Sequence, residues 1–477
     1  MLLRSIYLAI LLCLTPAVLA KGVSPYLPLK LDAAIEIEIE RLVSISKLPA
    51  LSKPYHVTTI NQYLAKVKDT HPHLYQRLST YMERYKTPAG ITHLSAELTI
   101  ADDNDVIIPN SRGQQIDDAY RLTATGFLQA NSYFAVNLGG THYESGGFMP
   151  HGTYLSAGWD VFQVDIGYRE HWLAPHHEGA LVLTTQAKPV LMATFSNSKL
   201  ITDWNIKYEL SVGILDEMDN IAYDGQRYSG EPGFLTMHLS FQPFDWWTLG
   251  GNRALMFGGG ERSVTLSDVW QAIIDPVNSD NCGGSGTELQ DCKEEVGNQI
   301  ASITSKFDFS LWNYPISLFA EYGGEDTGKY SNYRFGNIGQ NYGIFLPYVT
   351  ESTSLNIEWS KFHSAWYVHG IYGEGFSNDG NEMGHWWGDN KTQGDRSPGE
   401  AISTKLAWDN HQDLYVIATY RTATYDTETN SMLSQRSHEI DLELNYQLNK
   451  AMLGINLYAG RDNAGEDFIS TRVSYFW

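Results

Sequence analysis

The sequence predicts a mainly β fold, a transmembrane up-and-down antiparallel β-barrel that follows a small N-terminal α-helical bundle. Strand patterns with one apolar and one polar face recur to the end of the chain, and short and long connections alternate between them. An apolar leader opens the chain. In an outer-membrane barrel the apolar face contacts lipid and the polar face lines the lumen. A soluble β-sandwich explains one such hairpin, but not a long series without helices to cover it.

The last stretch of the chain, 436–477, shows this pattern most clearly. Side chains of a strand alternate between its two faces, and every second residue of 440–448 is apolar. These residues are Ile440, Leu442, Leu444, Tyr446 and Leu448. The final run, 469–477, repeats the alternation and ends on Trp477. A terminal strand of this kind resembles the signal that outer-membrane barrels present to the barrel assembly machinery, which we therefore expect as a partner.

Residues 1–20 have the pattern of a signal peptide. Arg4 precedes an apolar stretch and Ala20 ends it, so we expect cleavage after Ala20. No run approaches ~20 apolar residues, so the sequence predicts no transmembrane helix. In the oxidising compartment that a signal peptide implies, Cys282 and Cys292 are expected to form a disulfide that closes a loop.

The sequence pattern of residues 21–90 predicts helices rather than strands. Asp32 can cap a first helix that ends near Lys47, a second is expected over 60–68, and Pro72 suits the first turn of a third. Helices this short bury little area alone. We therefore expect a bundle that docks on the periplasmic mouth of the barrel.

Residues 91–477 form the predicted barrel. The hairpins 234–257, 303–322 and 402–425 have short connections, whereas 258–299 and 373–400 are long polar segments. Short periplasmic turns and long outer loops are typical of these barrels. Strands of ~10 residues then give about eighteen strands, an even number that leaves the helices and the C-terminus on one side. Aromatic residues beside the short turns are expected to form an interfacial girdle.

Composition excludes several classes of partner. The net charge of −22 disfavours nucleic acid and docking on anionic lipid. Two cysteines without a nearby histidine do not complete a metal site, so the sequence predicts no metal, and it indicates no cofactor.

Two groups of residues are candidates for a functional site. Arg169, Glu170, His171 and Trp172 crowd the end of one predicted strand, and Arg253 lies in a related element. This lumen cluster could contact sugar or gate the lumen, or it could be a salt-bridge cluster that holds a loop closed.

The second group lies in a long outer loop. It comprises His385, Trp386, Trp387, Asp389 and Arg396. Aromatic faces can stack on the CH surfaces of sugars, while Asp and Arg can bond hydroxyl groups. We therefore predict carbohydrate binding here. The alternative is a small core that packs the loop over the barrel.

The segments 167–175, 179–189 and 195–197, together with 250–260, resemble the capsule-assembly outer-membrane proteins of the Wzi type. Many members carry Gly-Pro-Gly where this chain has Ala174, Pro175 and His176. The resemblance spans the mature chain. It implies an eighteen-stranded barrel with a periplasmic helical bundle, and a surface lectin that anchors capsular or extracellular polysaccharide. It carries over no catalytic residues.

The predicted function is therefore a non-enzymatic polysaccharide-binding protein in the outer membrane of a Gram-negative bacterium. It would be a monomer surrounded by outer-membrane lipid and lipopolysaccharide. A diffusion porin for small polar solutes or oligosaccharides is one alternative, because strand number and polar inner faces allow it. The loop 258–299, closed by its disulfide, would instead plug the lumen. An outer-membrane hydrolase is a second alternative, for which no nucleophile or acid pair is apparent.

Overall fold

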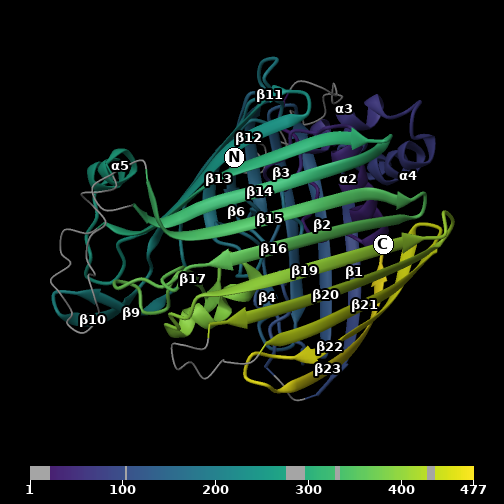
Figure 1. The fold of residues 1–477 in the computed structure, drawn as a ribbon. Coiled ribbons are helices and arrows are strands. Elements are labelled where there is room, and N and C mark those ends of the chain that lie inside the picture. The colour runs from purple at the N-terminus through teal and green to yellow at the C-terminus, as the bar shows by residue number, and fades with distance from the viewer. Residues whose placement is uncertain (1–21, 103–104, 276–295, 328–333, 427–435) are drawn as a thin grey trace, which may run out of the picture.

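The computed structural model describes residues 22–102, 105–275, 296–327, 334–426 and 436–477. One antiparallel sheet curls into a closed barrel, with helices at one end and long loops at the other (Figure 1). Its 18 wall strands run up and down, as predicted. They are β1 (Ala89–Ala101), β2 (Tyr120–Asn131), β3 (Phe134–Tyr143), β5 (Tyr154–Trp159), β6 (Phe162–Gly167), β7 (Leu191–Ser196), β8 (Lys207–Ile214), β11 (Gly233–Phe244), β12 (Trp247–Phe257), β13 (Gly297–Leu311), β14 (Tyr314–Thr327), β15 (Phe335–Thr350), β16 (Thr353–Phe362), β19 (Gly399–Asp409), β20 (Leu414–Tyr425), β21 (Ser437–Leu448), β22 (Ala451–Arg461) and β23 (Asp467–Phe476). A short strand, β4 (Gly147–Met149), pairs with β3.

The barrel closes where the first strand meets the last. Leu98 of β1 lies opposite Val473 of β23. Beyond it, Leu94 and Trp477 exchange two backbone hydrogen bonds of 3.1 and 2.8 Å. Each wall strand then has a neighbour on both sides, so the sheet presents no open edge to lipid. The aromatic end of the chain forms this seam.

The two faces of the wall differ as the alternation predicts. On β21, Ile440, Leu442 and Leu444 are exposed on the outside, whereas Asn445 is buried on the inside. Most of the other wall strands also expose large apolar side chains outward, which gives the barrel an apolar belt. At the short-turn end the belt finishes in stacked rings with centroids between 5.5 and 6.3 Å apart. These rings belong to Phe244, Trp246, Trp247 and Phe307.

Three helices and a short 3-10 turn precede the barrel: α2 (Ala33–Ile45), α3 (Val57–Lys66), α4 (Pro72–Met82) and η1 (Glu83–Tyr85). Asp32 caps α2 as predicted, by accepting from the amide of Ile35 at 3.0 Å. The second helix begins at Val57 and not at residue 60 as expected, and its N-cap residue His56 makes no side-chain capping hydrogen bond. Within the described ranges, no helix is long and apolar enough to cross a membrane.

The helices dock inside the short-turn mouth of the barrel, where a buried ionic network holds them. Arg41 of α2 lies 2.8 Å from Asp409 at the end of β19 and 3.5 Å from Glu38. Arg77 of α4 lies 2.7 Å from the same Glu38. Arg41 also donates to the carbonyl of Pro347 at 3.3 Å. The bundle therefore closes this end of the lumen.

Removing Arg41 should loosen the bundle selectively. In Arg41→Ala, Asp409 and Glu38 remain buried with one cation fewer, and breaking a buried network typically costs about 3 kcal/mol. We expect roughly 100-fold faster amide hydrogen exchange over 33–45. Arg461→Ala is the matched control, because its pair with Asp467 is exposed and should leave exchange unchanged. Equal protection of α2 in the wild type and Arg41→Ala would contradict this account.

Candidate functional site

An irregular chain segment, 168–190, fills the middle of the lumen between β6 and β7. Nearly all of its residues are buried. We call it the plug segment. The sequence predicted that 258–299 plugs the lumen. For the described part of this range the prediction was wrong, because its helix, Leu266–Ile274, packs on the outside of the wall. The predicted disulfide of Cys282 and Cys292 lies outside the described residues, as does the predicted signal peptide.

Carboxylates of the inner wall hold the backbone of the plug segment. Glu358 of β16 accepts from the amides of His177 at 2.6 Å and Glu178 at 3.1 Å. Glu321 of β14 accepts from the amide of Leu181 at 2.9 Å. A buried backbone without strand partners needs such acceptors, because an unpaired amide is costly in the interior.

Amides of the inner wall supply the matching donors. The side chain of Asn252 donates to the carbonyl of Leu173 at 2.8 Å, and that of Asn341 donates to the carbonyl of Gly179 at 3.1 Å. The sequence analysis missed all four wall residues. Their only signal was a polar side chain at the inward position of an alternating strand.

The predicted lumen cluster lies at the start of the plug segment. The guanidinium of Arg169 and the ring of His171 both contact Glu209 of β8 at 2.6 Å. Glu170 pairs with Arg112. Burial and the neighbouring Arg169 lower the pKa of His171. These contacts match the salt-bridge alternative, because the charged side chains are paired with one another inside the protein.

Trp172 connects the plug segment to the N-terminal segment. Its backbone forms a two-way bridge with Lys53, with hydrogen bonds of 2.8 and 3.0 Å, and the ammonium of Lys53 lies 5.2 Å from the ring centroid. The two plugging elements therefore support each other.

Arg253 does not belong to the lumen cluster, which corrects the sequence assignment. It lies on the outward face of β12, where its guanidinium donates to the carbonyls of Ala272 and Ile273 at 2.7 Å. Side chains of a strand alternate, so Arg253 shares its face with the apolar Leu255 and not with the inward Asn252.

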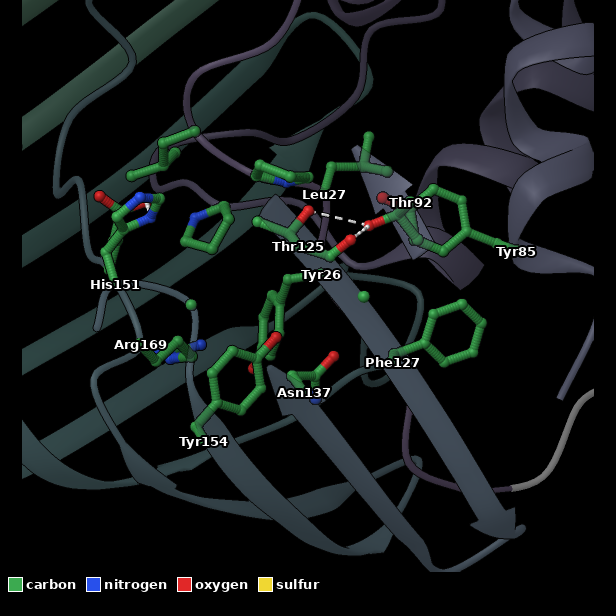
Figure 2. A pocket seen from close by; sticks show the side chains of 16 residues that line it. Tyr26, Leu27, Tyr85, Thr92, Thr125, Phe127, Asn137, His151, Tyr154 and Arg169 are labelled. Carbon is green, nitrogen blue, oxygen red and sulfur yellow. Dashed lines mark hydrogen bonds and ion pairs between the residues drawn. The ribbon is translucent and has the colours of Figure 1, made fainter. Parts of the chain in front are cut away.

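A cavity of about 50 Å³ remains beside the cluster, between the N-terminal segment and the wall (Figure 2). Tyr26, Tyr154 and Arg169 line it, and so do Thr92 of β1 and Thr125 of β2, whose hydroxyls hydrogen-bond to each other at 3.0 Å. It has room for a few waters but not for a sugar ring. A cavity of about 630 Å³ lies near the short-turn end, lined by residues such as Val57, Lys86 and Lys199.

A compact lid covers the plug segment from the long-loop end. It contains β17 (Ser377–Asn378), β18 (Asn381–Glu382) and the 3-10 helix η3 (Trp386–Gln393). The ring of Trp387 stacks between Phe362 at 5.0 Å and Tyr425 at 4.6 Å. This aromatic core fixes the lid on the ends of β16 and β20.

The residues predicted to bind carbohydrate all belong to this lid, but most point inward. Trp386 and Trp387 are buried, and His385 hydrogen-bonds Ser360 at 3.0 Å. Asp389 accepts from Gln186 of the plug segment at 2.6 Å. Arg396 alone among the five has an exposed side chain. The small-core alternative thus describes the packing of the two tryptophans, and carbohydrate contact by these residues stays a prediction.

The lid and the plug segment form one unit. The carbonyl of Met383 accepts from the amide of Thr184 at 2.9 Å. Tyr367, which precedes the lid in the chain, links the two: its hydroxyl donates to the carbonyl of Leu181 at 2.8 Å and accepts from the amide of His385 at 2.9 Å. Across the described ranges no group of three or more His, Cys, Asp or Glu side chains is arranged to hold a metal ion.

A closed wall with an apolar belt, a filled lumen and a packed lid define an occluded outer-membrane β-barrel. The sequence matches the family model described as capsule assembly protein Wzi over residues 83–460, and the chain belongs to that family. The resemblance expected from the sequence is thereby confirmed.

Two known proteins show how far the similarity extends. The structure of Wzi from Escherichia coli, described as an outer membrane protein involved in group 1 capsule assembly and a carbohydrate-binding β-barrel, matches with a TM-score of 0.71. Identity is 15%, and the match covers 96% of this chain and 99% of that one. An uncharacterized 55.8 kDa protein in the cps region of Klebsiella pneumoniae is 23% identical over 243 residues. That match spans 48% of this chain and 42% of the relative.

The stability of the lid should depend on pH through Asp389. Burial raises the pKa of Asp389 from 3.8 to about 7. Between these values the folded lid keeps a proton that the opened lid releases, so lid stability falls as pH rises and is lower above pH 7 than at pH 5. We expect smaller amide protection factors over 377–397 at pH 8 than at pH 5.

Asp389→Asn is the matched variant, because it keeps the shape of the side chain and removes its titration. The difference between the two pH values should shrink in this variant. The same pH dependence in both proteins would contradict the role given to Asp389.

Proposed function

We propose that the protein is a surface lectin that binds capsular or extracellular polysaccharide and anchors it at the cell surface. The observation that most supports this is the filled lumen, because a plugged barrel presents a fixed loop surface instead of a channel. The described function of the Escherichia coli Wzi protein, which shares the fold, agrees with it. No specific feature of the described residues favours a porin or a hydrolase.

The binding surface in this proposal is the outer face of the lid. Arg396 would contact sugar hydroxyl or acidic groups directly, while Trp386 and Trp387 hold the lid rigid beneath it. The ion pair of Lys188 with Asp379 lies at the same end and is partly exposed. A long polymer that engages several such weak contacts needs no deep pocket, since linked contacts raise the effective concentration of one another.

We infer an orientation with the long loops outside the cell and the helices in the periplasm. The girdle beside the short turns and the sealed wall support this orientation in the outer membrane. The apolar belt would contact membrane lipid and lipopolysaccharide, and the terminal strand would meet the barrel assembly machinery. Because each wall strand is paired on both sides, the barrel needs no second copy to complete its sheet, which supports a monomer.

The direct test is binding of the detergent-solubilised protein to purified polysaccharide from the same strain. We expect saturable binding by the wild type. With short oligosaccharides, Arg396→Ala should bind roughly tenfold more weakly. A hydrogen bond to a charged group contributes about 1.5 kcal/mol, and its loss lowers affinity by that factor. Arg461→Ala is the control, because Arg461 is also an exposed arginine at the long-loop end but is paired with Asp467.

A second measurement tests anchoring in cells. A deletion strain should release polymer into the medium and retain less at its surface. Unchanged surface polymer, together with no binding of the purified polysaccharide above that of an unrelated barrel, would overturn the proposed function. If Arg396→Ala bound the polysaccharide as tightly as the wild type, the contact would not involve Arg396.

A further inference from the structure

A short helix, α5 (Leu266–Ile274), lies at the long-loop end of the barrel (Figure 1). Its buried side chains, Val269 and Ala272, pack on Leu255 of β12 and on Val296. Thr265 and Asp268 form a capping box at its start. At its end, Arg253 donates to the last-turn carbonyls of Ala272 and Ile273. The helix is therefore fixed at both termini.

One flank of α5, beside the face that packs on the wall, carries an exposed apolar stripe. Leu266, Trp270 and Ile274 recur every four residues, so they share one face of the helix. Their exposed fractions are 89%, 63% and 59%. The exposed polar residues Ser267 and Gln271 lie on the neighbouring arc. A helix of this kind in water would leave a contiguous apolar patch uncovered, which soluble surfaces avoid.

The strand register places the wall residues that α5 covers next to the apolar belt. Leu239, Gly251 and Ile303 face one another in a row, and the leucine and isoleucine are 55% and 52% exposed. The next outward positions on β12 towards the long loops are Arg253 and Leu255, which α5 covers. The exposed apolar belt thus reaches up to the part of the wall that α5 covers.

The height of α5 on the wall fits the membrane interior rather than the water above it. Arg253 lies six residues beyond Trp247 of the girdle, which is about 20 Å along a strand and about 15 Å along the membrane normal at a ~40° tilt. Leu255 lies at about 20 Å by the same reasoning. The apolar band of such barrels is ~25 Å tall. Both residues therefore fall in the half of the band nearest the long loops.

We propose that α5 is an interfacial helix seated in the membrane leaflet at the long-loop end, with Leu266, Trp270 and Ile274 in contact with lipid acyl chains. The stripe has no charged residue, and Trp is favoured at the boundary between chains and headgroups. Continuity with the lipid-facing belt selects lipid as the occupant over a protein partner. The helix would replace the wall itself as the lipid contact at this level, independently of sugar binding.

Site-specific labelling of the full-length protein tests this proposal. In a background with Cys13→Ser, Cys282→Ser and Cys292→Ser, one cysteine at a time is introduced and labelled with an environment-sensitive fluorophore. The labelled proteins are reconstituted in bilayers whose acyl chains carry bromine, which quenches only in the apolar interior. Heat-modifiable migration in detergent gels verifies that each variant is folded.

Trp270→Cys and Ile274→Cys test the stripe at two independent positions. Leu239→Cys is the lipid-facing control, Gln271→Cys is the control on the polar arc, and Arg396→Cys is the water-facing control. We expect quenching at 270 and 274 to be at least half that at 239, weaker at 271 and absent at 396.

Labels at 270 and 274 that resist brominated lipid and are quenched by aqueous iodide would overturn the proposal, because the stripe would then face water. Resistance to both quenchers would also overturn it, since another protein surface would then cover the stripe.

Discussion

Hydrogen bonds from the inner wall to a buried, irregular backbone are the interaction on which this structure depends. The plug segment has neither helix nor strand, so few of its amides pair within the segment. Its burial therefore depends on hydrogen-bond partners from the wall, the lid and the N-terminal segment. Glu358 and Glu321 supply them as acceptors, and Asn252 and Asn341 as donors. The wall thereby turns a hollow barrel into a filled one.

The barrel that the plug segment fills is also closed at both of its ends. Helix α2 is held at the short-turn mouth by Arg41 and Asp409, and the aromatic core around Trp387 closes the other end. Because plug and lid are bonded to each other, the long-loop end is a firm surface on which polar groups keep their positions. A firm surface loses little entropy when it binds a long polymer through several weak contacts. The closed interior and the proposed tether function therefore have one structural origin.

The wall could be predicted from the sequence because its rules are local. Alternation placed Ile440 and Leu442 outside, the length of the barrel region at ~10 residues per strand predicted the strand number, and Asp32 marked the first helix correctly. The interior could not be predicted in this way. Glu358 and His177 are 181 residues apart, and no periodicity links them.

The outcomes of the predictions for individual site residues also have physical reasons. Trp386 and Trp387 have the composition of a sugar platform, but composition does not tell a surface aromatic from a buried one. The position of Arg253 could have been found, since it alternates in phase with the outward Leu249 and Leu255.

The central claim, that the barrel is a filled support and not a channel, is tested most directly by single-channel recording in a planar bilayer. The wild type should remain near the baseline current. A double variant, Glu321→Ala with Glu358→Ala, should show frequent openings, because the plug segment loses acceptors for the amides of His177, Glu178 and Leu181. A steady, large open level in the wild type would contradict the account.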